Sequence, residues 1–196
     1  MEEVKKINRI EALGLVKKKI KNKNLINHCL AVEAIMEALA RELNKKAGGD
    51  IYEEEKWAMT GLVHDIDYDQ TADDPQRHSI EGADFLKDFG FTDDIVYAVK
   101  AHNEIHGIPL ISEMDKALYA SDPISGLIVA AALIRPEKKL KAINSDSVMK
   151  RFGEKAFARG ANRQQIRECE KLGLTLEEFI DISLSAMQTI DKRLGL

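Results

Sequence analysis

Apolar residues recur at intervals of three and four over residues 24–43, and this spacing constrains the fold more than any other feature. The residues are Leu25, Cys29, Val32, Ile35, Met36, Leu39 and Leu43. Such spacing puts them on one face of a helix, which must be buried against other elements. Helical patterns continue along the chain, and no segment alternates apolar and polar residues as a half-buried strand would. The sequence therefore predicts an all-α fold.

Capping residues and helix breakers predict where the helices begin and end. The expected caps are Asn8 with Glu11, Asn24, Thr92, Ser147, Asn162 with Gln165, and Thr175 with Glu178. Further helices are expected over residues 53–64, 78–89, 92–103 and 112–134, followed by about three more. Residues 68–76 are polar and contain Pro75, which predicts a loop. Pro123 lies inside the apolar segment 112–134 and predicts a kink or a break near Asp122.

Length and composition limit the class of protein. A chain of 196 residues with 44% hydrophobic residues fits a single domain with a full core. A net charge of -4 argues against a nucleic-acid partner, and no apolar run approaches the roughly 20 residues that span a membrane. Residues 1–6 lack the apolar centre of a signal peptide, and two distant cysteines suggest a reducing compartment. We therefore expect a cytoplasmic protein.

One basic stretch departs from this ordinary surface. Residues 17–23 contain five lysines. They are either a solvated helix face and loop or a surface that attracts an anionic substrate or membrane.

The chain contains a set of side chains that could hold a metal ion. Its members are His28, His64, Asp65, His78, His102 and Asp122. Taken singly, each histidine has an ordinary explanation as a core or surface residue. Asp122 does not, because a carboxylate in so apolar a segment is costly unless it is paired or coordinates a metal. Imidazole and carboxylate together favour a divalent transition metal such as Fe, Mn, Zn, Co or Ni over Ca or Mg.

The order of these residues resembles the HD superfamily of metal-dependent phosphohydrolases. His28, the dipeptide His64-Asp65 and Asp122 match the residues that bind the metal in that family, across residues 24–134. The resemblance implies an HD-type helical bundle as this core, with C-terminal helices over residues 137–196 packed on it. The usual His-Asp-Ile-Gly run reads His64-Asp65-Ile66-Asp67 here.

Two further histidines are similar to those of a six-ligand, two-metal branch of this family. His78 and His102 fall between the His-Asp pair and Asp122, as in the bacterial hydrolases of symmetric dinucleoside tetraphosphates. The resemblance implies two divalent transition metals per chain, bridged by Asp65, and hydrolysis of a nucleotide or another small phosphoester. His106 follows His102 by four residues, but Gly107 suggests that the helix has ended before it.

Four other residues are candidates near this centre. Asp67 and Asp69 are expected either to orient ligand histidines or to act as a general acid, unless they only stabilise turns and caps. Arg77 and Lys100 are candidates for binding substrate phosphate.

Three other functions remain open at this point. The chain could be a mononuclear, nucleotidase-like hydrolase in which His78 and His102 face the substrate. It could be a di-iron oxygenase, or a non-catalytic HD module that binds a nucleotide. The sequence carries no prediction of oligomeric state.

Overall fold

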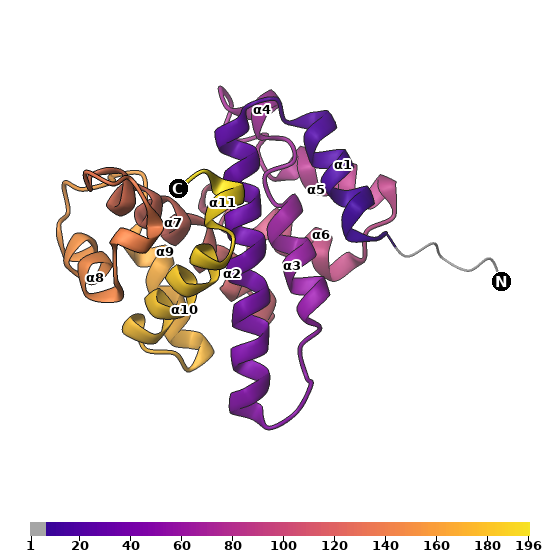
Figure 1. Ribbon diagram of the computed structural model, residues 1–196. Coiled ribbons are helices and arrows are strands. Elements are labelled where there is room, and N and C mark those ends of the chain that lie inside the picture. The colour runs from indigo at the N-terminus through magenta and orange to yellow at the C-terminus, as the bar shows by residue number, and fades with distance from the viewer. Residues whose placement is uncertain (1–6) are drawn as a thin grey trace.

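The computed structural model describes residues 7–196, and within that range it contains helices and no strand (Figure 1). The helices are α1 (Arg9–Lys19), α2 (Lys23–Ala47), α3 (Glu54–Val63), α4 (Tyr68–Thr71), α5 (Ile80–Phe89), α6 (Asp93–Ala101), α7 (Glu113–Leu133), α8 (Ser145–Gly153), α9 (Arg163–Arg167), α10 (Leu176–Thr189) and α11 (Asp191–Leu194). Short 3-10 turns lie at η1 (Glu104–His106), η2 (Leu140–Ala142) and η3 (Glu168–Leu172). The all-α prediction is confirmed. Residues 1–6, which were expected not to form a signal peptide, lie outside the described range.

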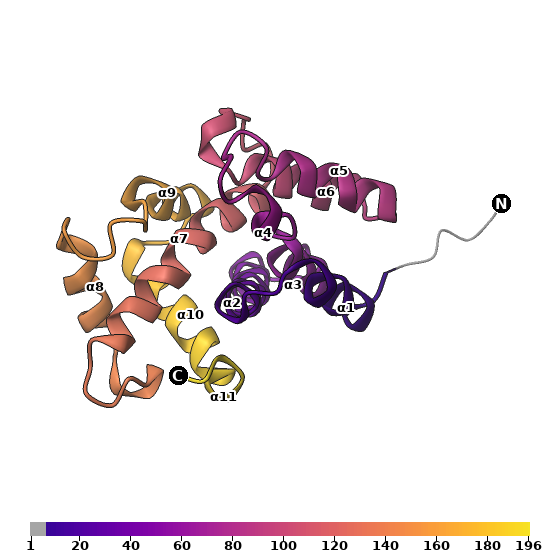
Figure 2. The ribbon, with the colours of Figure 1, turned by 90° about the horizontal axis from the view of Figure 1, so that it is seen from above.

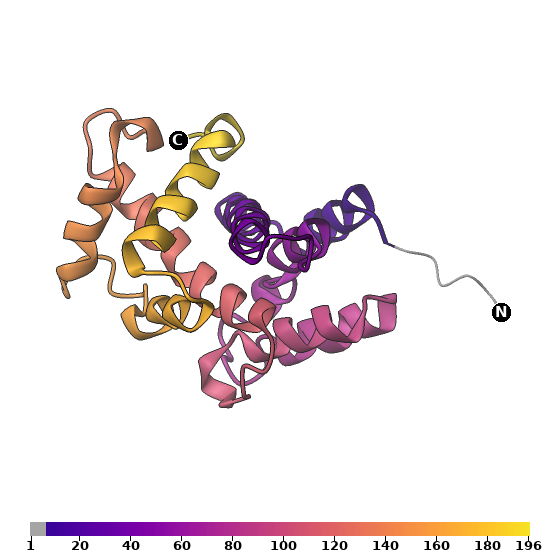
Figure 3. The same cartoon turned by 90° about the horizontal axis from the view of Figure 1, so that it is seen from below.

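Helix α2 is the central element of the molecule. It lies between α1 and α3 on one side and α7 and α10 on the other, as the side and top views agree (Figures 1 and 2). The view from below shows α5 and α6 side by side, away from α10 (Figure 3). Of the apolar residues predicted for one face of α2, all are buried except Leu25, which is half-buried at the start of the helix.

Helices α2 and α3 approach each other closely at Gly61. A Cβ atom at this position would lie 2.7 Å from the carbonyl oxygen of Val32, a distance that real side chains do not tolerate. Glycine is therefore required for this contact. The close approach brings the C-terminal end of α3, where His64 follows Val63, next to the N-terminal turns of α2.

Three of the six predicted caps occur in the structure. Capping boxes form at Asn8 with Glu11 and at Thr175 with Glu178, and Asn162 caps α9. Thr92 precedes α6 without a side-chain capping bond.

Two helix starts were predicted wrongly by two or three residues. Asn22, not Asn24, caps α2, because its side chain accepts the backbone N–H of Asn24. Asn144, not Ser147, caps α8, and Ser147 takes the third position of that capping box. In both cases a second residue able to cap a helix lies close by in the sequence.

Helix α7 is continuous, so the predicted break at Pro123 does not occur. Proline removes one backbone hydrogen bond, but tertiary packing can compensate for that loss. Ile124, Leu127 and Ile128, which follow the proline, are completely buried, and α7 packs against α2, α9 and η3. The expected loop over residues 68–76 also contains the single turn of α4.

None of the described helices combines the length and the apolar character that crossing a lipid bilayer requires.

Candidate metal centre

The structure brings together the six side chains that were predicted as metal ligands. They are His28 on α2, His64 and Asp65 directly after α3, His78 just before α5, His102 at the end of α6, and Asp122 within α7. Five segments that are distant in sequence therefore meet at one point. Four of these side chains lie at or beside helix ends, where the chain can change direction.

Asp65 lies at the middle of this cluster. Its Oδ1 is 3.5 Å from His64 Nε2, 3.4 Å from His78 Nε2 and 3.5 Å from His102 Nε2. Its Oδ2 is 3.5 Å from His28 Nε2. Atoms that coordinate one transition-metal ion at about 2.1 Å lie roughly 3.0–3.4 Å apart. The observed distances therefore suit ligands arranged around a cation.

Two overlapping sets of ligand atoms can be distinguished. Atoms of His28, His64 and Asp65 lie within 4.8 Å of one another, and so do atoms of Asp65, His78 and His102. Asp65 belongs to both sets. Asp122 extends the first set, because its Oδ1 is 3.1 Å from His28 Nε2 and 3.9 Å from His64 Nε2.

Each histidine is oriented by a hydrogen bond at its other ring nitrogen. His64 Nδ1 donates to the Gly61 carbonyl at 2.8 Å, and His102 Nδ1 donates to the Val99 carbonyl at 2.6 Å. A carbonyl oxygen can only accept, so in both rings Nδ1 carries the proton and Nε2 offers its lone pair. This arrangement is characteristic of histidines that bind metals.

The other two histidines follow the same rule with side-chain partners. His78 Nδ1 donates to Asp67 Oδ1 at 3.0 Å. His28 Nδ1 lies 2.8 Å from Ser125 Oγ, which itself donates to the Asp122 carbonyl and so accepts from the imidazole. All four Nε2 atoms therefore face the same space.

One unsatisfied atom supports a cation at this place. His102 Nε2 is buried and has no hydrogen-bond partner among the described residues. Buried polar nitrogens are rarely left unpaired. A metal ion between His102, His78 and Asp65 would give this nitrogen a partner. These residues therefore fit the divalent transition metal that the sequence implies.

Burial and charge shift the pKa values of these groups. Burial lowers the pKa of His64 to about 4, so its ring is neutral, as a ligand must be. Burial acts in the same direction at His28 and His102, but carboxylate partners outweigh it and raise both pKa values. The surrounding imidazoles hold the pKa of Asp65 below its usual range despite its burial. In the metal-free cluster, the carboxylates thus favour protonation of His28 and His102, whereas burial favours the neutral form of His64.

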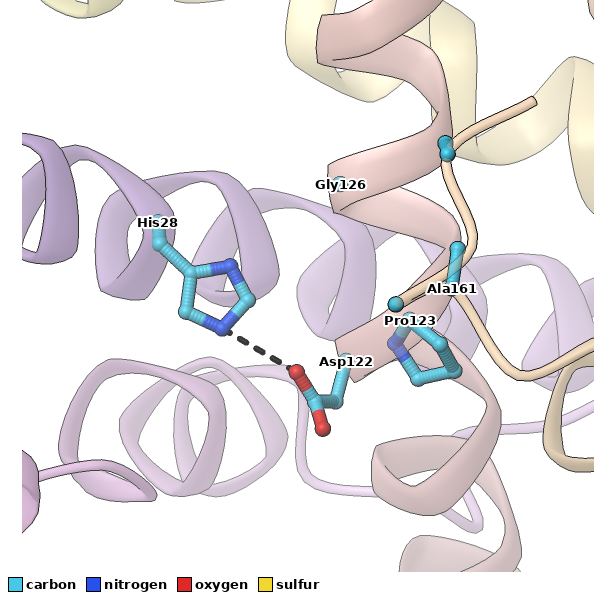
Figure 4. A pocket seen from close by; sticks show the side chains of 7 residues that line it. His28, Asp122, Pro123, Gly126 and Ala161 are labelled. Carbon is cyan, nitrogen blue, oxygen red and sulfur yellow. Dashed lines mark ion pairs between the residues drawn. The ribbon is translucent and has the colours of Figure 1, made fainter. Parts of the chain in front are cut away.

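A cavity of about 280 Å³ reaches this cluster beside α7. His28 and Asp122 lie on its wall and point toward each other (Figure 4). The side chain of Asp122 is 32% exposed, whereas His64 is completely buried. Small molecules can therefore reach the cluster from the Asp122 side.

The two aspartates predicted near the cluster have different surroundings. Asp67 is buried, and its Oδ2 accepts the N–H groups of Ser79 and Gly82 while its Oδ1 holds His78. Asp69 is exposed and accepts the N–H groups of Lys21 and Asn22, which join α1 to α2. Asp67 thus has the geometry of a residue that orients a ligand, whereas Asp69 stabilises a turn.

The predicted substrate contacts lie farther out. Arg77 is exposed and forms a two-bond ion pair with Glu81. Lys100 contributes its carbonyl to Ser79 Oγ, and its role with phosphate stays a prediction. His106 Nε2 donates to the His78 carbonyl at 2.9 Å, so it stabilises the turn that carries a candidate ligand without joining the cluster.

Three features of the site were not foreseen from the sequence. One is Ser125, which orients His28. Another is Tyr68, which packs edge-on against His78. Burial and the charges of Asp65 and Asp122 raise the pKa of Tyr68. The third feature is the segment of residues 158–161, which forms part of the cavity wall. The i+3 spacing of Ser125 from Asp122 was a local signal, but no local signal marks the distant segment.

A family model described as "HD domain" matches residues 25–135. The chain belongs to the HD domain family. This match confirms the resemblance to the HD superfamily of metal-dependent phosphohydrolases, and it covers the segment that carries all six candidate ligands. It ends before α8, so the C-terminal helices of this HD protein lie outside the matched region.

Several bacterial proteins named Ribonuclease Y are similar to part of this chain. The protein of Oleidesulfovibrio alaskensis is 30% identical over 118 residues, which is 60% of this chain and 21% of that protein. The protein of Lawsonia intracellularis is 31% identical over 144 residues, or 72% of this chain and 26% of that protein. The chain thus spans about a fifth to a quarter of the length of these relatives. No solved structure matches it.

Proposed function

We propose that this HD protein is a metal-dependent phosphohydrolase that acts on a nucleotide or another small phosphoester through two metal ions. The observation that carries the proposal is the position of Asp65, whose carboxylate belongs to both overlapping ligand sets. A shared carboxylate is the usual means of holding two ions a few ångströms apart. Divalent ions bound there would neutralise phosphate charge and lower the pKa of an attacking water.

The protein's own residues would prepare the site in three ways. The four imidazoles present neutral Nε2 atoms, because their Nδ1 protons are engaged elsewhere. Asp65 and Asp122 supply negative charge that offsets part of the charge of the ions. The cavity beside His28 and Asp122 admits a small phosphorylated substrate from one side.

Metal content and phosphate release test this proposal together. We expect about two equivalents of Fe, Mn, Zn, Co or Ni per chain by elemental analysis, and metal-dependent release of phosphate in a screen of phosphoesters. Asp65→Ala should lose both. Phosphate release that survives complete chelation, or full turnover by Asp65→Ala, would refute the hydrolase.

The same measurements separate the other functions. One equivalent of metal would favour the mononuclear hydrolase in which His78 and His102 face the substrate. Consumption of O2 with an organic substrate and without phosphate release would favour the oxygenase. Nucleotide binding without turnover and without metal would identify a non-catalytic module.

RNA is a second candidate substrate, because the similar proteins are named Ribonuclease Y. This similarity weakens the expectation, based on a net charge of -4, that no nucleic acid binds. An RNA oligonucleotide therefore belongs in the phosphoester screen. Cleavage of RNA that exceeds turnover of every mononucleotide would favour this candidate over a small substrate.

A further inference from the structure

The loop that joins α8 to α9 forms the wall of the cavity opposite His28 and Asp122. Three of its residues, Ala158, Gly160 and Ala161, line the cavity together with Pro123 and Gly126 of α7. In the close view the loop passes beside α7, with Ala161 near Pro123 (Figure 4). This loop lies outside the region matched by the family model.

Arg163 holds this loop in one shape. Its guanidinium donates to the carbonyl oxygens of Phe157 at 2.6 Å, Ala158 at 2.8 Å and Ala161 at 2.6 Å. It also reaches the carbonyls of Arg151 and Phe152, both at 3.3 Å. A single planar cation thus gathers five carbonyls of one segment. The loop is therefore a built wall of the cavity.

The same arrangement turns amide groups away from Arg163. In a trans peptide the N–H points opposite to the C=O of the same unit. The carbonyls of Phe157 and Ala158 face Arg163, so the amides of Ala158 and Arg159 face away from it. Neither amide donates to a carbonyl in the described part of the chain. Ala158 has a φ of 45°, in the left-handed region, where such amides can bind anions.

Arg159 adds a positive charge to this loop. It is exposed and lies between two residues that line the cavity. Within residues 7–196 it has no carboxylate partner, whereas Arg77, Arg151 and Arg167 are each paired with a glutamate. The cavity therefore has candidate metal ligands on one wall, and on the other a loop that carries two free amides and an unpaired arginine.

We propose that the loop of residues 154–162 is the substrate-recognition element of this site. It binds a second anionic group of the substrate through Arg159 and the amides of Ala158 and Arg159, while Arg163 keeps the loop in position. This inference rests on the proposed phosphohydrolase function for the identity of the ligand. It goes further because such a loop would favour substrates that carry a second anionic group in addition to the phosphate at the metal ligands.

Binding of imidodiphosphate, a diphosphate analogue that resists hydrolysis, tests this inference without turnover. We would measure its Kd by calorimetry on the entire 196-residue chain loaded with Mn. Arg159→Ala should raise the Kd about fivefold to tenfold, since an exposed charge-assisted contact is lost, and Arg159→Lys should recover part of the affinity. Arg135→Ala is the matched control, because Arg135 is exposed and unpaired in the described structure but lies beyond the end of α7.

Two results would overturn the inference. One is an unchanged Kd for Arg159→Ala, and the other is an equal loss for Arg135→Ala, which would show a general charge effect. Failure of the proposed function is a different observation, namely the absence of metal-dependent phosphate release by the wild-type protein. An Arg159-dependent Kd would support the recognition loop even in that case.

Discussion

The four candidate ligand histidines are oriented by four different acceptors. Two are backbone carbonyls three residues earlier, at Gly61 and Val99, and two are the side chains of Asp67 and Ser125. The rings are therefore held in position by the protein itself. Of these acceptors, only Asp67 is a charged side chain. Asparagine has nearly the same shape without the charge, so Asp67→Asn tests this acceptor with little change in structure.

Asp67→Asn should weaken metal binding about 10- to 100-fold. The Asp67 carboxylate accepts three hydrogen bonds, and an amide cannot accept on both sides, so His78 or the Ser79 and Gly82 amides lose a partner. Competition with a chromogenic chelator would measure the affinity. Asp73→Asn is the control, since Asp73 is an exposed acid a few residues away. Equal affinities for both variants would contradict the orienting role.

The histidines should titrate differently in the metal-free protein. His64 should stay neutral down to about pH 4, whereas His28 and His102 should take up protons above the ordinary value near 6.5. His64 thus contributes stability that is complete above pH 6.5 and is lost as the pH falls toward 4. His28 and His102 contribute stability that is complete below their ordinary pKa and is lost as the pH rises through their raised values. NMR titration of the imidazole signals would check the order, and a His64 pKa above 6.5 would contradict it.

At the scale of elements, helix α7 connects the candidate metal centre to the recognition loop. It carries Asp122 and Ser125 and then Gly126, which lines the cavity. A Cβ at Gly126 would meet no atom within 4 Å, so a side chain there would enter open space. This position can therefore be used to fill the cavity without disturbing the helix.

Gly126→Leu should raise the KM for a phosphorylated substrate severalfold while leaving the fold intact. Gly14→Leu is a matched control, because Gly14 is also an exposed glycine within a helix with open space at its Cβ. Both variants should increase the free energy of unfolding by about 0.5–1 kcal/mol, since glycine disfavours a helix. Thermal unfolding and steady-state kinetics would measure the two effects. Equal KM values for both variants would show that substrate does not use this cavity.

At the scale of the whole molecule, the candidate ligands join α2, α3, α6 and α7 at one centre. Helices α3 and α7 lie on opposite sides of α2, so the candidate ligands connect the two sides of the bundle. A ligand that binds only the folded state stabilises it in proportion to the logarithm of its concentration. Metal should therefore stabilise the entire fold, not only the cavity.

Removal of metal should lower the Tm by about 5–10 °C. At a free metal concentration of 100 times the Kd, binding contributes about 2.7 kcal/mol, and each kcal/mol shifts the Tm of a chain of this size by about 2–4 °C. Calorimetry with and without chelator would measure the change, and Asp65→Ala should show none. A wild-type Tm that is insensitive to chelation would indicate that no metal binds to the folded state.

The all-α class, most helix boundaries and the six candidate ligands could be predicted from the sequence. Apolar spacing and capping pairs such as Thr175 with Glu178 act over a few residues, so they can be read locally. The errors arose where neighbouring residues offered the same local signal, as at Asn22 and Asn24, or where packing opposed it, as at Pro123. The chemistry of imidazole and carboxylate likewise belongs to the residues themselves.

The tertiary structure alone decided how these residues meet. Ser125 holds His28 from 97 positions away, and the carbonyls gathered by Arg163 form a cavity wall that no motif predicts. Asp67 and Asp69 looked equivalent in sequence, yet one orients His78 and the other stabilises the turn between α1 and α2. Such contacts depend on how helices pack, since the free energy of burial is shared among distant segments, whereas spacing and capping are properties of a few consecutive residues.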